Sequence, residues 1–180
     1  MLRAVWATPP RLGAVRVLAV DGRSGSGKST AAGELVRMLA AGARVALVST
    51  DDFATWDDPV GWWPRLEAGV LGPLTRGEPG GYRRTEWPNG VPTLGSHIDV
   101  PVPDVLVLEG VSAGRRAMHS RLSHLLWVQL ADPDLRLERA VAREGEANRE
   151  PLRAWQRFEN GWFAVDRTAE RADSTITAAR

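Results

Sequence analysis

The sequence predicts an α/β domain with a mostly parallel five-stranded sheet, and three observations support this prediction. Short apolar runs alternate with helical patterns along the chain, as in βαβ units. The runs are continuously apolar, which is typical of strands buried on both faces of a parallel sheet. The chain has 180 residues, 43% of them hydrophobic, so it can bury a sizeable core. We therefore expect residues 1–180 to form a single domain.

Each of the five expected strands is a short run rich in aliphatic or β-branched residues. The first, VRVLAV, is stopped by Asp21 and Gly22. The last, STIT, is short and polar enough for an edge strand. The five runs cover residues 15–20, 44–49, 105–109, 125–130 and 174–177.

Three segments have helical spacing. The first spans residues 29–41, and we expect Gly42 to end it. The second begins at Asp132 and Pro133, a good N-cap followed by a residue suited to the first turn, and it runs through Arg143. After a break at residues 145–149, the third begins at Pro151. Its expected apolar stripe is Leu152, Trp155, Phe158, Trp162 and Val165.

Residues 72–104 interrupt this alternation. The segment holds six of the 12 prolines and six of the 18 glycines. Loops of this length are usually functional or disordered. Because the segment carries Tyr82, Arg83, Arg84 and Trp87, we expect a functional loop.

Composition excludes several classes of protein. The formal net charge of +1 is far from the basic surplus of a nucleic-acid-binding protein. The chain has no Cys, hence no disulfides and no thiolate zinc site, and its three His lack metal-binding spacing. No apolar run reaches membrane-spanning length, and the first residues lack the features of a signal peptide. We expect a cytoplasmic protein that binds neither nucleic acid nor a membrane.

A phosphate-binding loop is the strongest motif. Of the 23 basic residues, 22 are Arg, and Lys28 is the one Lys. It lies in GRSGSGKS, which matches G-x-x-x-x-G-K-[ST] between an expected strand and an expected helix. Glycines let backbone N–H groups surround an anion, Lys28 supplies a compact charge, and Ser29 supplies a hydroxyl for Mg²⁺. The motif predicts a three-layer P-loop NTPase fold. The expected nucleotide contacts are Gly22, Ser24, Gly25, Ser26, Gly27, Lys28, Ser29 and Thr30.

Two strands end in acidic residues. The carboxyl ends of parallel strands form the ligand-binding edge of such sheets. Asp51 follows the second strand, where it can accept a hydroxyl proton, bind Mg²⁺, or simply cap a turn. Glu109 ends the third strand in the manner of a Walker B acid that holds Mg²⁺, or as an acid with no such role. Gly110 follows it in place of a second acid, which favours transfer to a bound acceptor over hydrolysis.

Three blocks in this order resemble the uridine kinase family and the related nucleoside and phosphoribulokinase-like P-loop kinases. They are VLAVDGRSGSGKST, VSTDDF and PDVLVLEGVSAG. The stretch from Tyr82 to Trp87 and the element from Asp132 to Arg139 are weaker matches. The resemblance implies an ATP- and Mg²⁺-dependent kinase that acts on a small-molecule hydroxyl.

The resemblance also implies a role for individual residues. Asp51 matches the catalytic base, Lys28 and Ser29 the phosphate and Mg²⁺ contacts, and Glu109 the acid at the metal and substrate. Arg139 and Arg143 fall where the family keeps arginines in a lid, here residues 132–150. For each of these two arginines, a solvated helix face is the alternative.

The acceptor side departs from the family pattern. The expected insertion, residues 72–104, is short and glycine-rich, and Ala54 replaces the aromatic residue that usually follows Asp-Phe. Three nearby tryptophans either stack on a base or pack against helices: Trp56, Trp62 and Trp63.

The leading hypothesis is therefore a nucleoside 5′-hydroxyl kinase, with Tyr82, Arg84, Trp87, Asp51 and Glu109 contacting the acceptor. A nucleoside monophosphate kinase is the second hypothesis, since Arg83 and Arg84 could bind a phosphate. A nucleotide-binding switch and a non-catalytic P-loop protein are further alternatives. The oligomeric state stays open, a homo-oligomer included.

Overall fold

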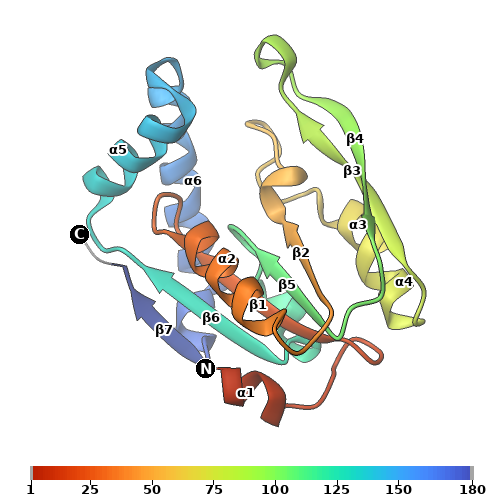
Figure 1. Ribbon diagram of the computed structural model, residues 1–180. Coiled ribbons are helices and arrows are strands. Elements are labelled where there is room, and N and C mark those ends of the chain that lie inside the picture. The colour runs from red at the N-terminus through yellow and green to blue at the C-terminus, as the bar shows by residue number, and fades with distance from the viewer. Residues whose placement is uncertain (1, 179–180) are drawn as a thin grey trace.

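The computed structural model describes residues 2–178 and has a parallel sheet at its centre (Figure 1). Its five strands lie in the order β2-β5-β1-β6-β7, and every neighbouring pair is parallel. The strands are β1 (Arg16–Gly22), β2 (Val45–Ser49), β5 (Val105–Glu109), β6 (His124–Gln129) and β7 (Ser174–Thr177). The predicted five-stranded sheet is thus confirmed, with strand ends within two residues of the expected ones.

Helical layers cover both faces of the sheet. On one face, α2 (Lys28–Leu39) packs Leu35 and Leu39 against strand residues such as Leu18. Val5 of α1 (Leu2–Ala7) joins this cluster. On the other face, three consecutive helical segments supply the cover: α3 (Trp63–Leu66), a π-helical turn (Glu67–Leu71) and α4 (Gly72–Thr75). Because neighbouring strand residues point to opposite faces, both layers are filled by the same continuous apolar runs, which confirms the three-layer prediction.

The segment of residues 72–104 is folded rather than a long loop. After α4 it forms an antiparallel hairpin of β3 (Gly80–Glu86) and β4 (Thr93–Val100), which is a separate two-stranded sheet. The glycines and prolines that suggested a loop lie largely at the ends and the turn of this hairpin. β4 is mostly exposed, and β3 mixes buried, half-buried and exposed residues, so neither strand has the continuous apolar run that marks the strands of the main sheet.

Two helices that pack on each other lie between β6 and β7, and the segment predicted as a lid, residues 132–150, includes the first of them and only the start of the second. In α5 (Pro133–Glu144), the Asp132 carboxylate caps the helix by accepting the N–H groups of Asp134 and Leu135 at 3.0 and 3.1 Å. A cluster of Leu137, Ala140, Val141 and Leu152 joins α5 to α6 (Arg149–Asp166). None of the helices within residues 2–178 has the length and apolar character needed to cross a membrane.

Two helix predictions need correction. The first of the three predicted helices, α2, ends at Leu39, three residues before Gly42. Gly42 lies in the following turn and donates its N–H to the Leu39 carbonyl. The stripe predicted for the last helix is wrong at Val165, which is 80% exposed. The buried residues of α6 are Leu152, Glu159 and Phe163. The buried face includes the acid Glu159, so a pattern of apolar residues alone does not identify it.

Candidate active site

The phosphate loop lies between β1 and α2, where the motif predicted it. Gly25 and Gly27 have φ angles of 74° and 94°, a left-handed conformation that residues with a Cβ rarely adopt. A Cβ on Gly25 would also lie 2.2 Å from the Arg136 carbonyl oxygen. Lys28 begins α2, is 8% exposed, and donates from Nζ to the Arg23 carbonyl at 3.1 Å. The loop thus brings a charged amine and a helix N-terminus together, as an anion site requires.

A cavity of about 310 Å³ opens over this loop. Arg139 and Arg143 of α5 also line it. The remaining lining residues are Gly25, Gly27, Lys28, Ser29 and Thr30. Of the other predicted nucleotide contacts, Ser24 lines a second cavity, while Gly22 and Ser26 line neither. The Ser26 hydroxyl is buried and has no hydrogen-bond partner among the described residues.

Glu109 lies between two serine hydroxyls at the carboxyl end of β5. Parallel pairing sets it opposite Ser49 of β2, and it accepts hydrogen bonds from Ser29 Oγ at 3.1 Å and Ser49 Oγ at 3.2 Å. Burial raises the pKa of the Glu109 carboxyl; Lys28 acts against this rise and Asp51 adds to it. The structure therefore unites a P-loop hydroxyl and an acidic side chain, both oxygen ligands suited to Mg²⁺. No group of three or more His, Cys, Asp or Glu among residues 2–178 forms a metal cluster.

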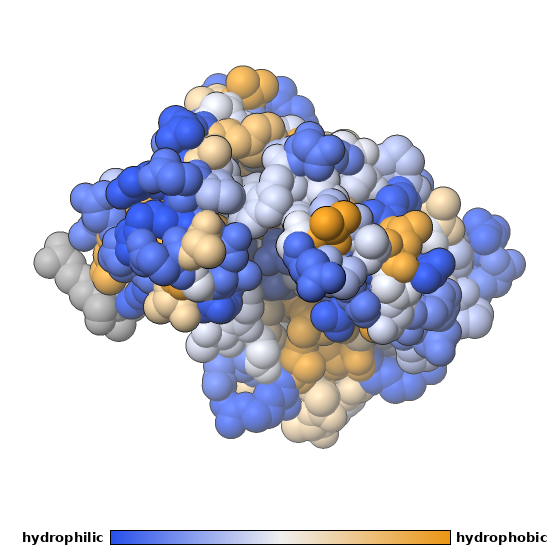
Figure 2. Space-filling view, turned by 90° about the horizontal axis from the view of Figure 1, so that it is seen from above, coloured by the Kyte–Doolittle hydropathy of each residue, from blue (hydrophilic) through white to orange (hydrophobic). Residues whose placement is uncertain are grey.

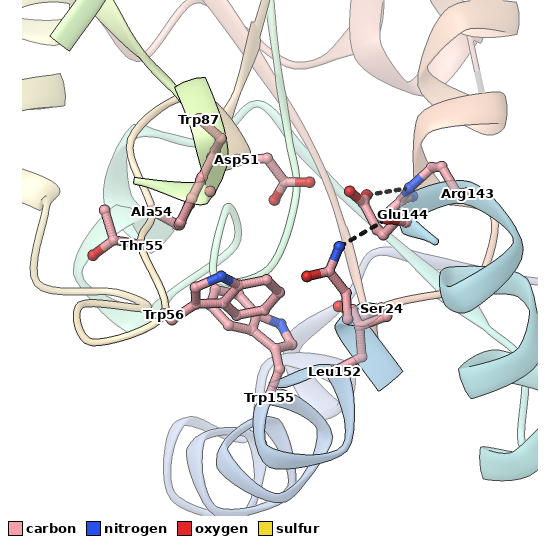
Figure 3. Close-up of a pocket in the computed structure, with 12 residues that line it drawn as sticks. Ser24, Asp51, Ala54, Thr55, Trp56, Trp87, Arg143, Glu144, Leu152 and Trp155 are labelled. Carbon is pink, nitrogen blue, oxygen red and sulfur yellow. Dashed lines mark hydrogen bonds and ion pairs between the residues drawn. The ribbon is translucent and has the colours of Figure 1, made fainter. Parts of the chain in front are cut away.

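Asp51 lies on a second, larger cavity of about 460 Å³ next to the first. The residue is exposed in a 3-10 turn, Thr50–Asp52, directly after β2. In Figure 3 its carboxylate is directed into the space that Trp56, Arg143 and Glu144 surround. Figure 2 shows the hollow from above, between the helices α5 and α6 on one side and the hairpin on the other.

An aromatic wall forms one side of this larger cavity. Trp56 lies 5.7 Å from Trp87 and 5.9 Å from Trp155, measured between ring centroids, and the second pair meets edge to face. The three rings come from the loop after β2, the hairpin turn and α6, respectively. Each indole offers a large, rigid apolar surface to a ligand.

Arg143 lines both cavities. Its Nε also contacts Glu144 Oε1 at 2.7 Å (Figure 3). Arg139, one turn earlier on α5, lines the phosphate-loop cavity but not the larger one. Arg143 therefore stands at the boundary between the two cavities.

Three of the five predicted acceptor contacts line neither cavity: Tyr82, Arg84 and Glu109. Tyr82 is buried, stacks on Phe53 at 4.6 Å, and donates its hydroxyl to Asp52 Oδ2 at 2.6 Å. Arg84 is exposed and pairs with Glu86 at 3.8 Å. Neither residue lines either cavity, nor does Glu109, whereas Trp87 and Asp51 line the larger one.

Trp62 and Trp63 also pack inside the molecule rather than facing a ligand. Their rings lie 5.0 and 4.4 Å from the guanidinium carbon of Arg115. Trp62 stacks on Phe53 as well, at 5.4 Å. Of the three tryptophans in question, Trp56 is thus the one that reaches the cavity.

Asp21, a fully buried acid in β1, is absent from the predicted site residues. Its carboxylate accepts three backbone N–H groups: Gly22 at 2.7 Å, Gly114 at 2.8 Å and Ser112 at 3.2 Å. Ser112 has a φ of 70°, so the loop after Glu109 is held in an unusual conformation. Burial raises the pKa of Asp21 to about 7, although these N–H groups and Lys28 lower it. A charged residue inside an apolar run was the available signal.

Glu159 of α6 was also missed. It is fully buried and accepts hydrogen bonds from Ser24 and Trp155, both of which line the larger cavity. The available signal was an acid flanked by aromatic residues on the buried side of an amphipathic helix.

No family model and no curated protein matches this sequence. Solved structures do match its fold. A protein from Bacillus stearothermophilus, named as a possible uridine kinase, has a TM-score of 0.65 at 19% identity, covering 94% of this chain and 90% of its own. A candidate fructose transport system kinase from Silicibacter sp. TM1040 has a TM-score of 0.61 at 22% identity, with coverage of 97% and 96%. The chain thus has the fold of P-loop kinases, and the fold that the resemblance implied is confirmed.

Proposed function

We propose that this protein is a kinase that transfers the γ-phosphoryl group of ATP to a hydroxyl group of a small molecule, with nucleosides as the leading acceptor class. The observation that carries this proposal is a pair of adjoining cavities with Arg143 on the boundary. One cavity has the features of a phosphate site. The other combines Asp51 with an aromatic wall. Such a pair suits a reaction between two bound substrates.

On the donor side, the phosphate loop fits a nucleotide triphosphate. Gly25, Gly27 and the N-terminus of α2 present backbone N–H groups, and Lys28 adds a positive charge. Ser29 and Glu109 would hold Mg²⁺, which typically takes one or two carboxylates together with substrate phosphates. When bound, Mg²⁺ neutralises charge on the phosphate oxygens.

On the acceptor side, Asp51 is the proposed general base. Asp51 is exposed, lines the larger cavity, and lies in the short turn that follows β2. This turn would direct its carboxylate at a bound acceptor. The carboxylate would accept the proton of the acceptor hydroxyl and orient that oxygen for attack. Arg143 would stabilise negative charge as the phosphoryl group passes between the cavities.

The lining of the larger cavity favours a neutral acceptor over a phosphorylated one. Of the described residues that line it, Arg143 alone is basic, whereas Asp51 and Glu144 are acidic. Arg83 makes hydrogen bonds across the hairpin to the carbonyls of Leu94 and Gly95 instead. This distribution supports a hydroxyl acceptor with a planar apolar part over a nucleoside monophosphate. The names of the two structural relatives also refer to kinases.

The proposal is tested by measuring ADP release from Mg-ATP across matched acceptors: nucleosides, their monophosphates, and sugars. We expect turnover with a neutral hydroxyl compound. Turnover with monophosphates alone would refute the acceptor assignment. Fast hydrolysis without any acceptor would favour a nucleotide switch instead.

The Asp51→Asn variant tests the mechanism. We expect kcat to fall by roughly 10²–10⁴-fold, the usual contribution of a general base, with the fold intact. Asp52→Asn is the matched control, because Asp52 is adjacent but bonds to Tyr82 and lies off the cavity. A parental kcat in Asp51→Asn would remove Asp51 from the mechanism.

A further inference from the structure

A fully buried carboxylate on α6 takes no part in the proposed transfer, yet it joins two parts of the site. Both oxygens of Glu159 face the backbone N–H of Ser24, at 3.0 and 3.1 Å. Oε1 also accepts the Ser24 hydroxyl and the indole N–H of Trp155, the latter at 2.8 Å. Three donors from two residues therefore converge on one side chain.

Burial makes these hydrogen bonds important for the fold, because Glu159 is fully buried and no water can replace a lost donor. A buried polar group without a hydrogen-bond partner is destabilising, so the folded state favours the arrangement in which Glu159 keeps its donors. Nη1 of Arg136 on α5 lies 4.0 Å away and supplies positive charge. The carboxylate is held by a rigid helix, and it in turn fixes the positions of the groups that donate to it.

Both partners of Glu159 line the larger cavity. Ser24 belongs to the phosphate loop, four residues before Lys28, and Trp155 forms part of the aromatic wall. Trp155 meets Trp56 edge to face, so its orientation also affects the neighbouring ring. Glu159 is thus a direct link between the nucleotide loop and the surface proposed to bind the acceptor.

We infer that Glu159 is a positioning residue that holds Trp155 and the phosphate loop in one arrangement, so that acceptor binding depends on it more than nucleotide binding does. The inference rests on the proposed function in that it takes the larger cavity to be the acceptor site. It adds a coupling between the two cavities through one buried side chain.

The Glu159→Gln variant keeps the size of the side chain but has one accepting oxygen for three donors. We expect the KM for the acceptor to rise by about tenfold or more, the effect of losing a charged hydrogen bond, and the KM for ATP to change by less than about threefold, since Lys28 and the glycine backbone remain. Trp155→Phe removes the indole donor together with part of the ring surface in the cavity, and it should raise the acceptor KM alone. Glu150→Gln, an exposed acid on the same helix, should behave as the parent does. Parental KM values in Glu159→Gln, or an equal rise in both, would overturn the inference.

A second measurement does not depend on catalysis. The protein is labelled with 5-fluorotryptophan, and the ¹⁹F resonance of Trp155 is identified by its loss in Trp155→Phe. We expect Mg-ADP to shift this resonance in the parent and to leave it nearly unmoved in Glu159→Gln. Equal shifts in both proteins, or none in a parent that binds Mg-ADP, would overturn the coupling.

The two measurements separate the inference from the proposed function. A parent that turns over no acceptor but shows the Glu159-dependent shift would refute the kinase proposal and retain the link. If Glu159→Gln does not fold, Ser24→Ala replaces it, because this variant removes only the hydroxyl donor. We then expect a reduced Mg-ADP shift at Trp155, and a parental shift would count against the inference.

Discussion

Raising the pH from 5 to 8 should lower the free energy of unfolding by roughly 3 kcal/mol through Asp21 alone. The Asp21 carboxyl is fully buried in the central strand, and burial raises its pKa from 3.8 to about 7. The unfolded chain exposes the group to water, so its pKa there is near 3.8. The folded state therefore binds this proton more tightly than the unfolded state does.

The sign and size follow from this difference in pKa. The stabilisation from the bound proton is complete below about pH 4 and is lost as the pH rises through the folded-state pKa near 7. The loss accumulates at about 1.4 kcal/mol per pH unit between these limits. For a protein of this size, a loss of roughly 3 kcal/mol corresponds to a fall in Tm of about 6–12 °C.

The assay is urea unfolding of the parent and Asp21→Asn at several pH values, followed by circular dichroism. Subtracting one curve from the other removes groups that titrate in both proteins. We expect the free energy of unfolding of the parent to fall relative to that of Asp21→Asn as the pH rises. This trend is expected whichever of the two proteins is the more stable at any one pH. Asp134→Asn, which replaces an exposed acid on α5, is the matched control.

A parent-minus-variant difference that stays flat between pH 5 and 8 would refute the reasoning. A direct check is the ¹³C titration of the aspartate carboxyls in the folded parent. If every one of them titrated near pH 4, burial would not raise the pKa of Asp21. This check also serves if Asp21→Asn fails to fold, because its amide would place an NH₂ group against the Gly114 N–H.

Three further predictions concern the site. Lys28→Met should weaken ATP binding by about 10–100-fold, since it removes a charged donor, and calorimetry that finds parental affinity would exclude Lys28 from the nucleotide site. Glu109→Gln should raise the Mg²⁺ concentration for half-maximal activity by about tenfold; an unchanged Mg²⁺ dependence would leave Glu109 with a structural role only. Trp87→Ala should raise the acceptor KM by about 3–10-fold without changing the ATP KM or Tm, because the ring is 37% exposed. A matching loss of Tm would show that the ring acts on stability instead.

The central sheet and the phosphate loop could be predicted because their signals are local. A parallel strand buried on both faces needs a continuous apolar run, and β5 is such a run from Val105 to Leu108 before it ends in Glu109. The loop motif depends on glycines, one Lys and one Ser at fixed spacing. Parallel pairing then brings the carboxyl ends of β2 and β5 together, as Ser49 and Glu109 show.

The acceptor side could not be predicted in the same way, because its residues meet only in three dimensions. Tyr82 was expected to contact the acceptor, but its ring packs in the core against Phe53. Trp155 was expected in an apolar stripe, but its indole N–H bonds to Glu159 and its ring lines the cavity. The hydrogen bond from Ser24 to Glu159 joins a loop and a helix that are 135 residues apart. Such a contact produces no periodic pattern in the sequence.

The hairpin of β3 and β4 has a consequence for how such a protein diversifies. Within residues 2–178, its strands share no hydrogen-bonded edge with the parallel sheet, yet its turn brings Trp87 and Gly90 to the cavity wall. Insertions or exchanges in that turn would reshape the cavity while the register of the five parallel strands stays as it is. Selection for new ligands can therefore act on a peripheral module, and the chemistry of the phosphate loop is inherited unchanged.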